Sequence, residues 1–241
     1  MISPVEIVEV TTIEGIGGLI QGALGFGINL VAVPLLLFVD PRLVPGPALV
    51  TGLVLAGLLA HRERSAVDVR GLGWILAGRL PGSVLGTFIV AVVSERVLGA
   101  LAGGLVFAAA IASYLISALP TTPWRLVAAG TASGFMSTTA SVGGPAVALA
   151  YQSQSGSTVR GTLAATTLVG SAISLVGLGF AGHFGAVEVQ FTGIMLPGAL
   201  TGYMLSRHLT RYVDRGWMRK LVVALCLVAG AAAVVRSALA G

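Results

Sequence analysis

Cysteine and charged residues are both scarce in this chain of 241 residues. The single cysteine, Cys226, excludes an intrachain disulfide and a metal site built from several thiolates. Charged residues make up 10% of the sequence, whereas a soluble domain carries about a quarter. So few charges cannot cover a water-facing surface. The composition therefore indicates a protein that is surrounded by membrane lipid.

Aromatic residues are also few, at 6%, which leaves no platform on which bases could stack. The formal net charge is +5, but the basic residues lie in short segments between apolar runs, where they set membrane topology. The sequence has no H-E-x-x-H motif, P-loop or nucleophile elbow. We therefore expect no enzyme activity, no cofactor or metal, and no nucleic-acid partner.

Apolar residues and glycine are abundant, at 56% and 34 residues, and the mean hydropathy is +0.96. About 20 apolar residues cross a bilayer as a helix. Six runs approach that length: 43–60, 72–93, 97–118, 162–181, 191–206 and 218–237. Two further regions, 13–39 and 126–150, are slightly longer and are interrupted by glycines and small polar residues. For Glu14, in the first of these, we expect a water-exposed mouth position, and the alternative is a buried acid that carries a coupling proton.

The two interruptions cover residues 21–29 and 137–145. Glycine is costly inside a helix, and proline is favoured at a first helical position. The pattern therefore predicts that a helix ends in each interruption and that new helices begin near Ile28 and near Pro145.

An internal repeat relates the two halves of the chain. The motif Leu80-Pro81-Gly82 recurs as Leu196-Pro197-Gly198, 116 positions later, and the same offset aligns the two interrupted regions. The segment 66–69 resembles 186–189 with a slip of four residues. Several matches in one order indicate a duplication. We therefore divide the chain into membrane repeats at 1–119 and 120–241.

Basic residues predict how the repeats are oriented. The loop with Arg62, Arg64 and Arg70 should face the cytoplasm, whereas the equivalent segment of the second half, 183–190, has no Lys or Arg. The second half instead has its basic cluster at 207–220. The sequence therefore predicts an all-α integral membrane protein with two inverted repeats, each a re-entrant broken hairpin plus three transmembrane helices. If 13–39 crosses fully, strict inversion fails.

The run Gly22-Ala-Leu-Gly25-Phe-Gly27-Ile-Asn29-Leu-Val-Ala-Val-Pro34 resembles the glycine motif of the sulfite exporter TauE/SafE family. The run Val142-Gly143-Gly144-Pro145 resembles its second copy, and the segment from Ala60 to Val69 is similar to the family's following loop. The resemblance covers nearly the whole chain. It implies a multi-pass permease of the inner membrane that carries small, often sulfur-containing anions such as sulfite or sulfoacetate.

Irregular backbone at membrane depth survives only inside protein or beside a water cavity, so the interruptions are the expected substrate site. Two helix N-termini would converge there on one small anion. Arg79 would attract the anion or extend toward the cytoplasmic face, and the small residues would contact it or only permit close helix packing. The predicted substrate-binding residues are Gln21, Gly22, Gly25, Phe26, Gly27, Asn29, Thr51, Arg79, Ser137, Thr138, Thr139, Ser141, Gly143, Gly144 and Thr167.

These observations predict a secondary transporter, most simply an exporter, that binds its anion near the midplane between the broken helices. Two alternatives stay open: a passive anion channel, and a membrane assembly protein that moves no solute. The expected partners are the anion and membrane lipid. The glycine-rich surface permits a homodimer but does not require one.

Overall fold

The computed structural model describes residues 3–115 and 120–213, and within them it is helical without any strand. The elements are α1 (Pro4–Leu24), α2 (Ile28–Val39), η1 (Pro41–Leu43), α3 (Gly46–Arg62), η2 (Arg64–Ala66), α4 (Val69–Val92), α5 (Glu95–Leu115), α6 (Pro123–Ala140), α7 (Gly144–Ala150), α8 (Gly156–Phe180) and α9 (Ala186–Val213). Three of the described helical segments, Pro41–Arg62, Val69–Val92 and Gly156–Phe180, are long and apolar enough to cross a membrane. The run predicted at 218–237, with Cys226, lies outside the described residues.

Both predicted helix breaks are confirmed. The first lies between Leu24 and Ile28, where Gly25 and Gly27 have φ of 93° and 110°. These left-handed conformations suit glycine because it has no Cβ. The second lies between α6 and α7, where Ser141 has a φ of 57°. The chain therefore leaves its helical path at both glycine-rich segments.

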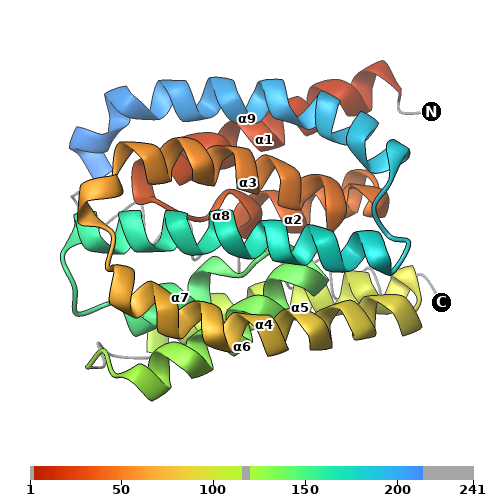
Figure 1. The fold of residues 1–241 in the computed structure, drawn as a ribbon. Helices are drawn as coiled ribbons and strands as arrows, with labels where there is room; N and C mark the ends of the chain where they lie inside the picture. Colours follow the sequence, from red (N-terminus) through yellow and green to blue (C-terminus); the bar gives the residue numbers. More distant parts are fainter. Residues whose placement is uncertain (1–2, 116–119, 214–241) are drawn as a thin grey trace.

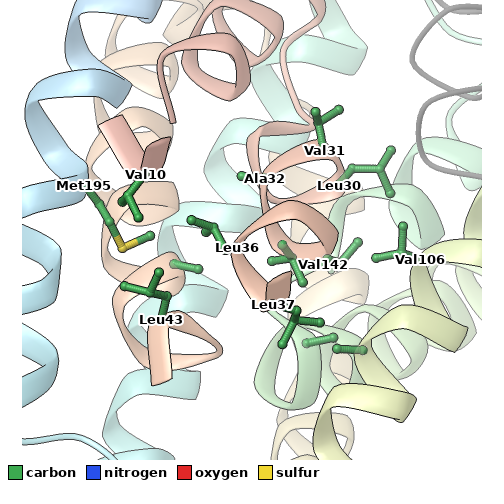
Figure 2. Close-up of a cluster of buried hydrophobic side chains, with 14 of the residues drawn as sticks. Val10, Leu30, Val31, Ala32, Leu36, Leu37, Leu43, Val106, Val142 and Met195 are labelled. Atoms are coloured by element: carbon green, nitrogen blue, oxygen red, sulfur yellow. The ribbon is translucent and has the colours of Figure 1, made fainter. Parts of the chain in front are cut away.

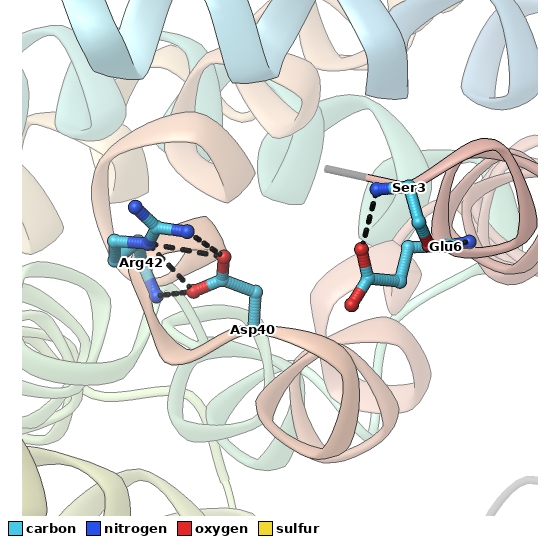
Figure 3. Close-up of polar contacts among 4 residues, drawn as sticks. All are labelled: Ser3, Glu6, Asp40 and Arg42. Atoms are coloured by element: carbon cyan, nitrogen blue, oxygen red, sulfur yellow. Dashed lines mark hydrogen bonds and ion pairs between the residues drawn. The ribbon is translucent and has the colours of Figure 1, made fainter. Parts of the chain in front are cut away.

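The first helix is longer than the sequence predicted, because it begins at Pro4 and not near residue 13. A capping box stabilises its start: Ser3 N–H donates to Glu6 Oε2 at 2.6 Å, and Glu6 N–H donates to Ser3 Oγ at 3.3 Å (Figure 3). Its 21 residues span about 31 Å. α1 is thus as long as a bilayer core is thick. The break follows its last residue, Leu24.

The second helix lies in the centre of the bundle. Nine of its 12 residues are buried, which is the pattern of a helix enclosed by protein on all sides. Its side chain Leu36 belongs to a buried cluster to which three other helices contribute: Val10 of α1, Val106 of α5 and Met195 of α9 (Figure 2). After α2, Arg42 pairs with Asp40 at 2.6 Å in the link to α3 (Figure 3).

The long helices form two tightly packed pairs at opposite sides of the bundle, with α3, α8 and α2 between them (Figure 1). In one pair α1 runs parallel to α9, and Gly18 lies against the backbone of Ala199. In the other α6 runs parallel to α4, and Gly134 lies against the backbone of Arg79. Glycine permits these approaches because a Cβ would overlap the neighbouring backbone.

The two central helices α3 and α8 run in opposite directions. The start of α3 lies near the segment after α8, where a Cβ on Gly46 would be 3.1 Å from Phe184. Near the other end of α3, a Cβ on Gly161 would be 2.9 Å from the carbonyl oxygen of Glu63. In the repeat predicted from the sequence, these two helices are each other's counterparts.

The packing register of the two helix pairs differs by one helical turn from the offset between the two Leu-Pro-Gly motifs. Gly198 lies against the carbonyl of Thr11, and Gly78 lies against the carbonyl of Val127 in the same way. Thr11 and Val127 are 116 positions apart, but Gly78 and Gly198 are 120 apart. The offset of 120 is the one that the segments 66–69 and 186–189 indicated, so the two Leu-Pro-Gly motifs do not occupy equivalent positions.

The same register identifies the counterpart of Arg79. Since Gly134 contacts Arg79 and its equivalent Gly18 contacts Ala199, the residue that corresponds to Arg79 is Ala199. The offset between the two Leu-Pro-Gly motifs would instead place Arg79 opposite Met195. In the register of the two helix pairs, Arg79 therefore corresponds to a small apolar residue.

Candidate functional site

A small polar cavity lies where the two helix breaks meet α4 and α8. The space inside it that water-sized groups can occupy is about 30 Å³. The residues that line it are Gln21, Phe26, Gly27, Ile28, Asn29, Leu30, Gly52, Arg79, Ser137, Ser141, Val142, Gly143, Gly144, Pro145, Thr167 and Ser171. Segments more than 100 positions apart in the sequence thus share one site.

Arg79 supplies the positive charge of the cavity. Its side chain is 1% exposed, so it does not extend to the membrane surface, which was one of the two readings of the sequence. Nη1 donates to Ser133 Oγ at 2.7 Å, and Nη2 donates to Ser137 Oγ at 2.8 Å. These bonds fix the guanidinium against α6, while Nε has no partner among the described residues.

No carboxylate in the described part of the chain pairs with Arg79. The ion pairs found there join Asp40 to Arg42, and Glu63 to both Arg62 and Arg160. A buried charge without a counter-charge is strongly destabilising, by several kcal/mol. An anion in the adjacent cavity would supply the missing counter-charge.

Hydroxyl groups next to Arg79 can donate hydrogen bonds to such an anion. Ser137 Oγ accepts from Arg79, so the proton of this hydroxyl is free to point into the cavity. Thr167 and Ser171 lie four residues apart on α8, hence on one face of the helix, and both line the cavity. The polar wall therefore comes from α4, α6 and α8.

Gln21 and Asn29 fix the geometry of the first break. Gln21 Oε1 accepts from the N–H of Ile28 at 3.1 Å and so caps the start of α2. Asn29 Nδ2 donates to the carbonyls of Ala48 and Ser141 at 2.9 Å each. Asn29 thereby ties α2 to α3 and to the end of α6.

The start of α2 and the start of α7 both border the cavity, as the sequence predicted. The N–H of Ile28 is already bonded to Gln21, however, and α7 has seven residues, so its dipole is short. Arg79 is therefore the main source of positive potential, and the helix ends are secondary.

Five predicted site residues lie outside this cavity. Gly22 packs against Ser206, and Gly25 packs against Arg160. Thr51 and Thr139 donate to carbonyls of their own helices, as does Thr138, which also bonds to Ser174. In these positions the glycines permit close packing and the threonines satisfy backbone groups.

The sequence analysis missed Ser133 and Ser171. Ser133 lies four residues before Ser137, so helical periodicity could have placed both on the Arg79 face of α6. Ser171 bears the same relation to Thr167 on α8. Four more lining residues lie in the motifs quoted from the sequence but were not predicted to be part of the site: Ile28, Leu30, Val142 and Pro145. Gly52 also lines the cavity and carried no signal of its own.

An ionic cluster covers the first break at one end of the bundle. Glu63 accepts from Arg160 at 3.4 Å and lies 3.4 Å from Arg62 Nε, and Arg62 donates to the carbonyl of Gly22 at 3.2 Å. Gly25 packs directly on Arg160. The cluster links the ends of α1 and α3 to the start of α8.

The comparisons with known proteins agree with this architecture. The family model described as Sulfite exporter TauE/SafE matches residues 13–233, nearly the whole chain. Searches among curated proteins and among solved structures gave no match. The extent of the family match, together with apolar helices that can cross a bilayer, assigns a multi-pass membrane protein. The chain belongs to the sulfite exporter TauE/SafE family of membrane transporters.

Proposed function

We propose that this chain is a secondary transporter that exports a small sulfur-containing anion, such as sulfite or a sulfonate like sulfoacetate. One observation carries the proposal: Arg79 is a buried cation beside a polar cavity, without an acidic partner among the described residues. Family membership supports the class of substrate.

The chemistry of the cavity suits an oxyanion. A guanidinium presents several N–H donors in a planar fork that matches the oxygens of a sulfonate or sulfite. The hydroxyls of Ser137, Thr167 and Ser171 add donors without further charge. One cation with neutral donors binds an anion weakly enough for release, which transport requires.

We further propose that the two halves are inverted repeats. The antiparallel course of α3 and α8, which are equivalent in the repeat, supports this relation. The two helix pairs support it further. In each pair a helix that precedes a break packs in parallel with a helix of the other half: α1 with α9, and α6 with α4. In this arrangement the end with Arg62 and Arg160 faces the cytoplasm, and the chain lies in the inner membrane.

The proposal is tested with the full chain in proteoliposomes. Vesicles loaded with one anion are diluted into a labelled pool, and counterflow is measured for sulfite, thiosulfate, sulfoacetate and sulfate. We expect saturable counterflow with the wild type for at least one sulfur anion. Arg79→Gln should lose about 1.4 kcal/mol or more of interaction with the anion, hence at least about tenfold in apparent affinity.

Arg125→Gln is the matched control, because Arg125 lies in the first turn of α6, away from the cavity, and bonds to the carbonyl of Pro120. Its counterflow should equal that of the wild type. Unsaturable flux with large single-channel currents would favour a passive channel. Absence of movement for every anion of the panel would refute the transporter proposal.

A further inference from the structure

Glu14 is a buried acid that the proposed anion site does not use. Its side chain is 0% exposed, so the expectation of a water-exposed mouth position is wrong. Neither carboxyl oxygen receives a hydrogen bond from the described residues. An ionised carboxylate in such surroundings would cost many kcal/mol, so the group must be neutral or must find a cation.

Where the structure describes the side chains of the neighbouring helices, no charged group is found against Glu14. The helices packed against α1 are α9, α2 and α3, and α2 has no titratable side chain. Among the residues whose side chains the structure describes, the titratable groups on the other two are His61 and Arg62 on α3, and Glu188 and Tyr203 on α9.

Each of these four groups lies elsewhere. His61 and Arg62 are in the last turn of α3, about 15 Å along the helix from Thr51, which neighbours Glu14. Glu188 accepts from the N–H of Gly185 at 2.7 Å, and the ring of Tyr203 lies beneath Arg62. On α1 itself, Glu6 bonds to Ser3 and Glu9 is exposed.

The polar neighbour of Glu14 on α3 offers no hydrogen bond to an ionised carboxylate. The hydroxyl of Thr51 on α3 lies beside the carboxyl. A hydroxyl has a single proton, and Thr51 donates it to the carbonyl of Ala48 at 3.1 Å. Thr51 therefore has no proton left with which to stabilise an ionised Glu14, and neither carboxyl oxygen has another hydrogen-bond partner among the described residues.

We propose that Glu14 is a proton-binding site whose loading and release are coupled to movement of the anion. This inference rests on the proposed transport function. The proton comes from water and returns to water. Its release leaves a carboxylate that has no hydrogen-bond partner among the described residues to stabilise its charge. Release therefore requires α1 to move relative to α3 and α9 until water reaches the carboxyl.

Two direct connections link Glu14 to the anion cavity. Gln21 is seven residues further along α1, on the same face, and it lines the cavity and caps α2. Thr51 precedes Gly52, which lines the cavity where α3 meets Asn29. A displacement of α1 against α3 thus changes the geometry of both sites together.

The protonation state is measured by infrared difference spectroscopy of the full chain at neutral pH. We expect a carbonyl band of a protonated carboxylic acid in the wild type, shifted in D₂O and absent from Glu14→Gln. The exposed acid on the same helix gives the control Glu9→Gln, which should retain the band. Identical spectra for wild type and Glu14→Gln would overturn the inference whether or not any anion is carried.

Coupling is measured in proteoliposomes with thiosulfate, an anion that does not titrate near neutral pH. A gradient of about one pH unit supplies about 1.4 kcal/mol per proton, enough for about tenfold accumulation. Wild type, Glu9→Gln and Glu14→Asp should respond to the gradient. Glu14→Gln should still exchange thiosulfate but show no response, and a response equal to that of the wild type would overturn the coupling. If the wild type carries no thiosulfate, the transport proposal fails for this anion, while the infrared result still decides the protonation of Glu14.

Discussion

Arg79 on α4 lies flat against Gly170 on α8, at a place where any Cβ would overlap the guanidinium. The absence of a side chain at Gly170 thus creates the space in which the arginine reaches Ser133 and Ser137. Gly170→Ala should displace the guanidinium and break at least one of these bonds. We expect the apparent affinity for the transported anion to fall by about tenfold, or about 1.4 kcal/mol, in counterflow measurements.

The same helix offers a matched control. Gly179 is exposed, and a Cβ there would meet nothing within 4 Å. Gly179→Ala should leave transport unchanged. Equal transport by Gly170→Ala and Gly179→Ala would show that the position of Arg79 does not matter for the anion.

The two serines that hold Arg79 should differ in effect. Ser137→Ala removes an acceptor for Nη2 and a donor that faces the cavity, whereas Ser133→Ala removes only the acceptor for Nη1. A hydrogen bond to a charged group contributes about 1.5–3 kcal/mol. We expect Ser137→Ala to raise the half-saturating anion concentration more than Ser133→Ala. The concentration dependence of counterflow measures both, and the reverse order would contradict the assignment.

Replacement of Asn29 by Asp tests the link between the helix breaks. A carboxylate cannot donate to Ala48 or Ser141, so the carbonyl of Ser141 loses its donor, the carbonyl of Ala48 keeps the hydroxyl of Thr51, and a negative charge enters the cavity. Asn29→Asp should destabilise the protein by about 2–5 kcal/mol and abolish anion exchange.

Thermal unfolding in detergent, followed by circular dichroism, measures the stability of this variant. The control is Gln154→Glu, which makes the same chemical change at an exposed position. A wild-type melting temperature for Asn29→Asp would mean that the two bonds of Asn29 contribute nothing to the break.

The packing of α1 on α9 should depend on Gly198. A Cβ at this position would overlap the backbone of Thr11, which cannot rotate out of the way. Gly198→Ala should therefore destabilise the protein by about 1–3 kcal/mol. Gly193→Ala, on the same helix, meets nothing within 4 Å and should be neutral or slightly stabilising. Equal melting temperatures for the two variants would rule out tight α1–α9 packing.

Much of the fold was predictable because helix breaks have a local chemical signal. The glycines before Ile28 and the Gly-Pro pair at Gly144 mark two helix starts that the structure confirms within one residue. Arg79 was recognisable because a charge inside an apolar run is costly and needs a reason. Local composition was sufficient for both.

Features that depend on packing register were not predictable in this way. The two Leu-Pro-Gly motifs suggested one offset between the halves, but contacts of Gly78 and Gly198 show another. The early start of α1 at Pro4 depends on a capping box ahead of the apolar run. Burial of Glu14 depends on α3 and α9, which are distant in sequence, so no local pattern indicated it.

The proposed anion site combines polar and apolar groups. Arg79, Ser137 and Ser171 line the cavity together with Phe26, Ile28 and Leu30. If Arg79 holds the charged group of the anion as proposed, an alkyl group on the same anion can be buried against the apolar residues. Sulfate has no apolar part and would gain nothing from them. We therefore expect the wild type to prefer sulfoacetate to sulfate in the counterflow panel.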